Sequence, residues 1–137
     1  MKEENQKMME EKYYEFNILS QRIKQIEKQV EAITQQIMEI NMTSQSLDEV
    51  STLSQGAEIL IPLSNGIFAK AELKDTKDLL INVGSDTIVK KSIADTIQFI
   101  SKQAEDLKSA HKQYIVELQS LASRAASIEK ELVEMAG

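Results

Sequence analysis

The sequence predicts a mainly α-helical fold with a small β region, in which two long helices form an antiparallel coiled coil and are joined by two β-hairpins. The single Pro and every Gly except Gly137 lie between Gly56 and Gly84, which leaves two long stretches without helix breakers. Both stretches carry apolar residues at coiled-coil spacing, and the segment between them contains short apolar or alternating runs separated by turn residues. We therefore assign residues 1–55 to the first helix, 56–91 to the hairpins and 92–137 to the second helix, all within one domain.

The first helix is predicted from apolar residues that recur alternately three and four residues apart. This is the spacing of a coiled-coil seam, the line of side chains that one helix packs against another, and it persists over four heptads. Ser44 is a polar residue on the seam, and toward the N-terminus Met9 keeps the spacing whereas Lys12 interrupts it. The seam positions are Phe16, Leu19, Ile23, Ile26, Val30, Ile33, Ile37, Ile40, Ser44 and Leu47.

The second helix shows the same spacing from Ile93 to Met135. Ser92 and Asp95 fit a capping box with Ser92 as the N-cap residue, so the start of this helix is well marked. His111 occupies a seam position, where we expect a partly solvated core residue or a polar residue that sets the register, and not a metal ligand. Two helices of nearly equal length joined by a short segment pair most economically in opposite directions, which brings both chain ends together.

Four short strands are predicted between the helices. Asn65-Gly66 supplies the positive φ that a tight turn needs, and a second turn is expected at residues 84–86. The predicted strands cover residues 58–63, 67–73, 79–83 and 87–90.

These strands have no helix of their own to cover them, because both helices use their apolar seams on each other. An isolated hairpin is marginal in water, and exposed strand edges pair with other chains. We therefore predict that the segment assembles subunits. The apolar residues expected to carry this oligomerisation are Ile59, Ile61, Ile67, Phe68, Leu79, Ile81, Val83 and Ile88.

Composition argues against catalysis and against metal or nucleic-acid binding. The chain has no Cys and one His, which excludes disulfides, thiolate zinc sites and multi-histidine metal sites. Its net charge is -6 and no segment is basic, so neither nucleic acid nor a membrane is expected as a partner. Asp75 and Asp78 stand beside Lys residues in a polar connector, which favours turn chemistry over an acid–base pair. We predict no catalytic residue, metal or cofactor, and a soluble cytoplasmic protein without a signal peptide.

The middle segment resembles the β-hairpin region of prefoldin, and more specifically that of its alpha-class subunit from archaea. The residues that carry the resemblance are Ile59-Leu60-Ile61-Pro62-Leu63, the run from Phe68 to Asp75, and Val83-Gly84-Ser85. The resemblance covers the whole order of helix, two hairpins and helix, although the helices match only in pattern. The beta class has a single hairpin, so the four strands favour the alpha class.

This resemblance implies a hetero-hexamer of two alpha-class and four beta-class subunits, in which the hairpins form a β-barrel platform and the coiled coils project from it. It further implies an ATP-independent chaperone that holds unfolded client proteins at the coiled-coil tips and passes them to a group II chaperonin. No nucleic acid, membrane or cofactor is implied.

The tip residues themselves suggest client contact, since apolar side chains gather where the two helices end and some lie off the seam. Met suits varied partners because its side chain is flexible and polarizable. A plainer interpretation is that these residues form the last turns of the coiled-coil core. The candidates are Met8, Met9, Tyr13, Tyr14 and Phe16 on the first helix, with Leu132, Val133 and Met135 on the second.

Two other classes of function remain open. The chain could be a purely structural or tethering coiled-coil protein, in which the β segment assembles subunits and the helices act as spacers. It could instead be a helical arm of an enzyme, although the acidic balance and the absence of a catalytic segment count against that reading. Self-assembly into larger or filamentous forms through the strand edges is also open.

Overall fold

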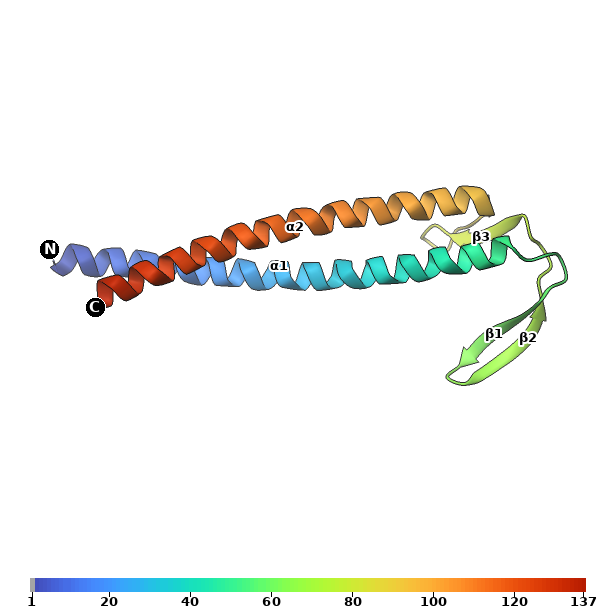
Figure 1. Cartoon of the computed structure of the whole chain (residues 1–137), viewed down its shortest axis with the longest axis horizontal. Coiled ribbons are helices and arrows are strands. Elements are labelled where there is room, and N and C mark those ends of the chain that lie inside the picture. The colour runs from blue at the N-terminus through green and yellow to red at the C-terminus, as the bar shows by residue number, and fades with distance from the viewer. Residues whose placement is uncertain (1) are drawn as a thin grey trace. The chain divides into compact units, whose positions relative to one another are not determined.

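The computed structural model describes residues 2–137 and has the predicted order of helix, two hairpins and helix (Figure 1). The fold class is therefore confirmed. The chain divides into two units, which we describe separately: the coil unit contains the described residues up to Ile37 together with Asp106–Gly137, and the hairpin unit contains Met38–Glu105. The elements are α1 (Lys2–Ser51), β1 (Glu58–Ser64), β2 (Ile67–Glu72), β3 (Asp78–Asn82), β4 (Ile88–Ser92) and α2 (Ile93–Ala136).

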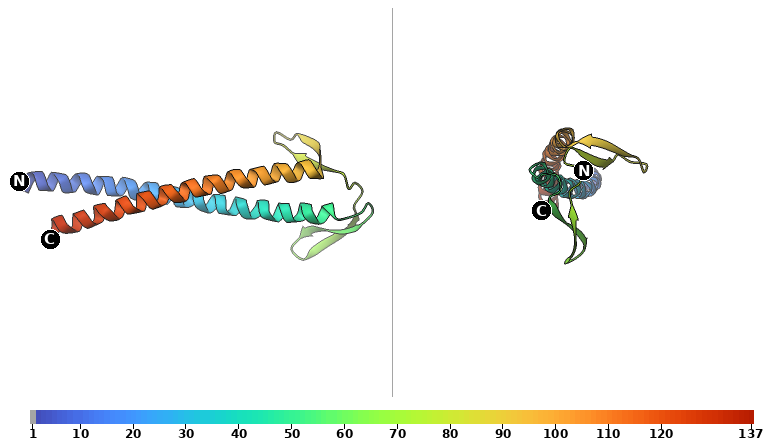
Figure 2. Two further views of the ribbon diagram at one scale, coloured as in Figure 1. Left: turned by 45° about the horizontal axis from the view of Figure 1, so that its top comes forward. Right: turned by 90° about the vertical axis from the view of Figure 1, so that its right-hand side faces the viewer.

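In the coil unit, α1 and α2 run in opposite directions and cross each other, so that the start of α1 and the end of α2 lie at the same end of the unit (Figure 2). Ile26 and Ile128 are completely buried in the seam. All other predicted seam positions of this unit, His111 among them, are buried or half-buried. The alternating spacing therefore marks the contacting faces correctly, as a coiled coil requires.

In the hairpin unit, α1 ends at Ser51, four residues before the predicted boundary at residue 55. The hydroxyl groups of Ser51 and Thr52 donate hydrogen bonds to the carbonyl oxygens of Asp48 and Glu49, at 2.6 and 2.7 Å. Gly56 then adopts a φ of 85°, which is outside the helical region. Ser and Thr compete with the helix for its backbone groups, so the helix ends at this hydroxyl-rich run and not at the glycine.

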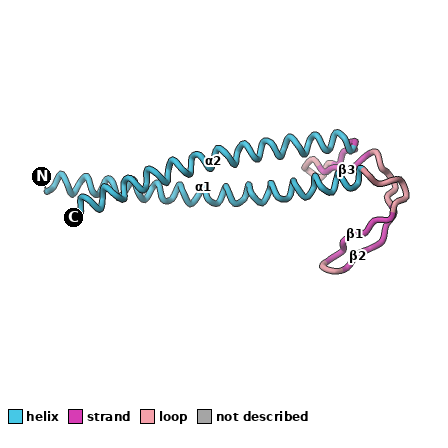
Figure 3. Tube along the Cα trace, viewed as in Figure 1, coloured by secondary structure: helices cyan, strands magenta, loops and turns pink. Residues whose placement is uncertain are grey.

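The strands form two separate two-stranded antiparallel sheets, β1 with β2 and β3 with β4 (Figure 3). Glu58 pairs with Glu72 and Asp78 pairs with Ser92, and the β1–β2 register shifts between Pro62 and Ser64. The predicted hairpins are thus confirmed, with small changes at their ends. The fourth strand extends to Ser92 and passes directly into α2, whereas it was predicted to end at residue 90.

The two hairpin turns differ in backbone conformation. In the β1–β2 turn Gly66 has a φ of 78°, as predicted for the second residue of Asn-Gly. In the β3–β4 turn Ser85 and Asp86 have φ values of 50° and 58°, directly after Gly84 with a φ of 106°. Two non-glycine residues therefore occupy the left-handed region, which costs about 1–2 kcal/mol per residue relative to glycine.

Candidate functional site

A groove of about 300 Å³ opens at the end of the coil unit where α1 begins and α2 ends. Apart from the carboxylate of Glu129 and the hydroxyl of Tyr13, its lining side chains are apolar. Large side chains continue on both helices up to this end, and Leu132 is buried in the seam while its neighbour Val133 remains exposed. Its lining residues are Tyr13, Phe16, Glu129, Leu132, Val133 and Ala136.

The predicted client-contact residues all lie at this end, but they differ in exposure. Met8, Tyr13, Tyr14 and Val133 are 51, 52, 70 and 67% exposed. Met9, Phe16 and Met135 are half-buried at seam positions. Leu132 is only 6% exposed, so it belongs to the packed seam and can meet a partner only if the coil end opens.

An ion pair closes the coil beside the groove. The Lys12 ammonium donates a hydrogen bond to the Glu131 carboxylate, and this bond holds the pKa of Glu131 below its ordinary value. Lys12 is the residue that interrupts the predicted seam. The structure therefore replaces a missing apolar contact by a charged one, which the spacing alone did not reveal.

Two further ion pairs cross between the helices of this unit. The Arg22 guanidinium contacts Glu117 at 2.9 Å, and the Arg124 guanidinium contacts Glu15 at 3.1 Å. All four side chains are about half exposed, so each pair adds little to stability. The pairs instead favour one register of the two helices, because sliding one helix along the other would separate the partners of every pair.

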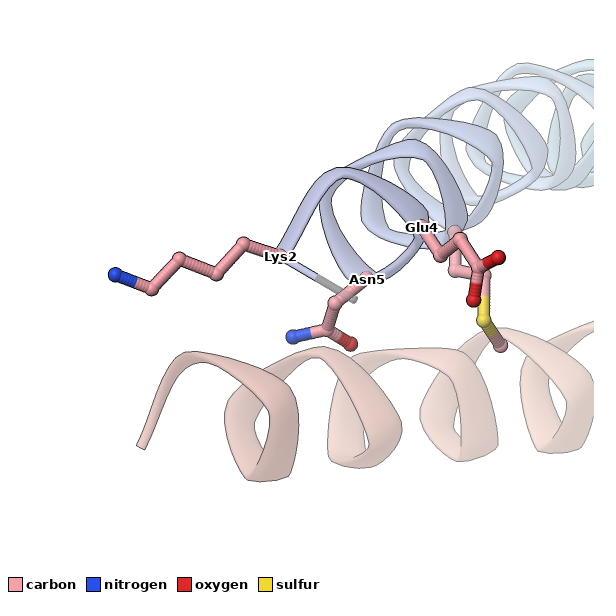
Figure 4. Close-up of a pocket in the computed structure, with 4 residues that line it drawn as sticks. Lys2, Glu4 and Asn5 are labelled. Carbon is pink, nitrogen blue, oxygen red and sulfur yellow. The ribbon is translucent and has the colours of Figure 1, made fainter.

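A second hollow of about 510 Å³ lies along the first turns of α1 and is lined by Lys2, Glu4, Asn5 and Met8. Figure 4 shows the Lys2 side chain pointing away from Glu4 and Asn5, so these polar groups do not converge. All four residues belong to one helix. The hollow is a shallow surface feature beside the exposed Met8, and its polar groups do not form a binding site.

The hairpin unit carries the second candidate surface. Of the predicted oligomerisation residues, Ile61, Ile67, Phe68, Val83 and Ile88 are exposed, while Ile59, Leu79 and Ile81 are half-buried. The prediction missed a further set of exposed apolar side chains on the same strands. They are Leu60, Leu63, Leu80 and Val89.

Two of these residues, Leu60 and Leu80, lie on the opposite strand face from the predicted residues of β1 and β3. The register places Leu60 opposite Lys70 and Leu80 opposite Lys90, on the face that alternates with Ile59, Ile61, Leu79 and Ile81. Uninterrupted runs such as Ile59-Leu60-Ile61 are the available sequence signal, since they are typical of strands buried on both faces.

The connector between the hairpins forms a turn, as predicted. One carboxylate oxygen of Asp75 accepts hydrogen bonds from the backbone N–H groups of Lys77 and Asp78, at 2.8 and 3.3 Å, and these bonds lower the pKa of Asp75. A hollow of about 420 Å³ lies beside it, lined by Gln55 and residues 74–77. Within residues 2–137, no group of three or more His, Cys, Asp and Glu side chains is arranged to hold a metal ion.

No helix in the described part of the chain has both the length and the apolar character needed to span a membrane.

Comparison with known proteins gives a consistent result. The family model described as Prefoldin subunit matches residues 19–136. The chain is 30% identical over 126 residues to Prefoldin subunit alpha of Methanococcus aeolicus, an alignment that covers 92% of this chain and 85% of the relative. It is 31% identical to Prefoldin subunit alpha 1 of Methanocaldococcus jannaschii, over 90% of this chain and 84% of the relative.

A more distant relative and a solved structure agree with this. Prefoldin subunit alpha of Thermofilum pendens is 26% identical over 86% of this chain and 92% of its own length. The cryo-EM structure of filamentous PFD from Methanocaldococcus jannaschii has a TM-score of 0.70 and covers 89% of this chain and 98% of its own, at 12% identity, so the fold is shared. The family match and the alpha-class relatives, which span most of the chain, show that this protein belongs to the prefoldin family as an alpha-class subunit of the archaeal type.

Proposed function

We propose that this subunit acts in an ATP-independent holdase that binds unfolded proteins at the coil end and delivers them to a group II chaperonin. In this proposal two copies assemble with four beta-class subunits in the cytoplasm. Prefoldin is a chaperone family and not an enzyme family, which supports the general role. Our proposal adds to this role how clients are bound, how many subunits of each class assemble, and which chaperonin receives the clients.

One observation carries the client-binding proposal: large apolar side chains are exposed at the end of the coil that holds the groove, and two of them, Tyr13 and Val133, line it. Met8, Tyr13, Tyr14 and Val133 are each more than half exposed there, whereas a coiled-coil core would bury such residues. An unfolded chain displays apolar side chains in extended backbone, and Met and Tyr contact such segments with little demand for one geometry.

Assembly is supported by the hairpin unit. Both hairpins are two-stranded and expose apolar side chains of β1 to β4, so each has unpaired edges and uncovered faces. Pairing with hairpins of other subunits satisfies the edges and covers the faces at once.

The test measures aggregation of a chemically denatured client in the presence of this subunit and a single-hairpin partner, without nucleotide. The variant Tyr14→Gln with Val133→Gln removes two exposed apolar side chains at the groove end. We expect wild-type protein to suppress light scattering at substoichiometric levels and the variant to lose about tenfold in effectiveness, as for the loss of two apolar contacts.

The matched control is Ile18→Gln with Val116→Gln, which removes two exposed apolar side chains of the same coil unit away from the groove. They are 48 and 57% exposed. This control is expected to suppress aggregation as well as wild type does. Equal activity of both double variants would overturn client binding at the coil end and would favour the tethering role.

A further inference from the structure

We infer that the groove at the coil end selects client segments in which a Lys or Arg adjoins a bulky apolar residue, with Glu129 as the specificity-determining residue. This inference rests on the proposed client-binding function and specifies the chemistry of that same site. It is carried by the composition of the groove, by the pairing of the charges around it and by the charge of the whole coil end.

The groove combines apolar walls with one ionised group. Phe16, Leu132 and Val133 form apolar wall, and Glu129 contributes the carboxylate. Glu129 lies three and four residues before Leu132 and Val133, so the three side chains share one face of α2. A bulky apolar side chain seated against Val133 therefore places its sequence neighbour beside a carboxylate.

Charge pairing distinguishes Glu129 from its neighbour. Glu131 is paired with Lys12, whereas none of the ion pairs formed within residues 2–137 involves Glu129. A cationic side chain of a client can therefore pair with Glu129 without displacing a partner of this chain. Tyr13 is 52% exposed in the same groove and offers an aromatic face to that cation.

The residues around the groove also carry a net negative charge. Residues 2–16 and 129–137 contain eight Glu and four Lys, which gives a net charge of -4 out of -6 for the whole chain. A concentration of negative charge attracts basic segments and repels acidic ones, within the roughly 10 Å range that screening leaves at 0.1 M salt. Lys and Arg also have apolar stems that can lie along the groove wall while the charged group reaches Glu129.

The experiment measures binding of short fluorescent peptides to the full chain by anisotropy. The three peptides have Phe or Leu at every second position. The positions between them are all Lys in the first peptide, all Gln in the second and all Glu in the third. At low salt we expect the Lys peptide to bind about fivefold more tightly than the Gln peptide, the size of an exposed charge contact plus a cation–π contact. The Glu peptide is expected to bind more weakly than both.

The variant Glu129→Gln keeps the size of the side chain and removes its charge. It is expected to reduce the preference for Lys over Gln to about twofold, the part supplied by the Tyr13 ring and the surrounding charge. The control Glu105→Gln removes an exposed carboxylate elsewhere on α2 and is expected to keep the full preference. In about 0.5 M salt the preference should become smaller for every protein, since exposed charges are then screened.

The outcomes separate the inference from the function on which it rests. Equal binding of the Lys and Gln peptides to wild type, or an undiminished preference in Glu129→Gln, overturns the charge selectivity while leaving client binding intact. Failure of all three peptides to bind overturns the proposed function as well. A preference reduced by Glu129→Gln and kept by Glu105→Gln supports the inference.

Discussion

At the scale of single residues, Lys12 shows how a break in the apolar pattern is accommodated. A lysine at a seam position cannot be buried alone, because an unpaired charge is expensive to remove from water. It remains partly exposed and pairs with Glu131 across the coil. The last turns of the coil are therefore held by a charged contact, next to the buried Leu132 and the exposed groove residues.

This pair predicts a pH dependence. The hydrogen bond from Lys12, helped by the charges of Lys12 and Arg124, lowers the pKa of Glu131. A carboxyl group with a lower pKa in the folded state contributes stability above its unfolded pKa and loses it as the pH falls through the folded pKa. From about pH 6 to about pH 3, the melting temperature of wild type should therefore fall more than that of Glu131→Gln.

The matched control for this prediction is Glu134→Gln, because none of the ion pairs within residues 2–137 involves Glu134. Its melting temperature should follow the wild-type pH profile. If the melting temperatures of wild type and Glu131→Gln changed with pH in parallel, the contact between Lys12 and Glu131 would have no effect on stability.

The packed seam next to the groove gives a second prediction at this scale. Ile128 is completely buried against the partner helix, whereas Val116 of the same helix is 57% exposed. Ile128→Ala should lower the free energy of unfolding by about 2–5 kcal/mol, through lost burial and the cavity that remains. Val116→Ala should change it by no more than about 0.5 kcal/mol.

Urea titrations of both variants measure this difference in the free energy of unfolding, with the same dependence of that free energy on urea concentration used for both. Similar losses for the two substitutions would mean that Ile128 does not pack in solution as it does in the structure.

At the scale of elements, the junction between β4 and α2 joins two kinds of structure without a loop. Ser92 is the last residue of the strand, and its hydroxyl accepts a hydrogen bond from the backbone N–H of Asp95 at 3.0 Å. Its carbonyl oxygen accepts one from the hydroxyl of the buried Thr96, at 2.8 Å. Ser92 thus serves as the N-cap that the sequence predicts.

Removal of this cap should weaken α2 at its start. Ser92→Ala leaves the Asp95 N–H without its acceptor and should cost about 0.5–2 kcal/mol of stability. Ser92→Asp keeps an acceptor oxygen and should stay near wild type. Thermal unfolding followed by circular dichroism distinguishes them, and equal melting temperatures for the Ala and Asp variants would argue against the cap.

At the scale of the whole molecule, the two units present different apolar surfaces. The hairpin unit exposes large apolar side chains on all four strands, and the coil unit exposes them at the groove end. Monomeric proteins rarely leave such surface uncovered. This difference is consistent with the proposal that the hairpin surface makes permanent subunit contacts and the groove makes transient client contacts.

The assembly prediction uses Phe68→Ser with Ile88→Ser. These side chains are 57 and 62% exposed, on β2 and β4. The control, Lys70→Ser with Lys90→Ser, changes the residues two positions along each strand, on the same faces. Mixed with a beta-class partner, wild type and the lysine control should form a multi-subunit complex, and the apolar variant should not.

Light scattering coupled to size-exclusion chromatography measures the mass of each mixture. A complex of wild-type mass from the Phe68→Ser, Ile88→Ser variant would place the subunit contacts elsewhere on the chain.

Several features of this protein follow from the sequence by itself. Apolar residues spaced alternately three and four apart, such as Ile26 and Ile33 on α1 and Ile128 on α2, determine the packed face of each helix. They do so because residues at this spacing lie along one side of a helix. Gly66 and Ser92 determine a turn and a helix start through their own backbone and hydroxyl chemistry. Such features are local, and a residue and its near neighbours are sufficient to define them.

Only the tertiary structure decided which side chains meet across the coil and which stay uncovered. The pairing of Lys12 with Glu131, the burial of Leu132 beside the exposed Val133, and the second apolar face at Leu60 and Leu80 depend on the register between distant segments. The physical reason is that heptad spacing and strand alternation repeat themselves, so they define a face of an element equally well in several registers. The contacts of specific side chains select one of these registers.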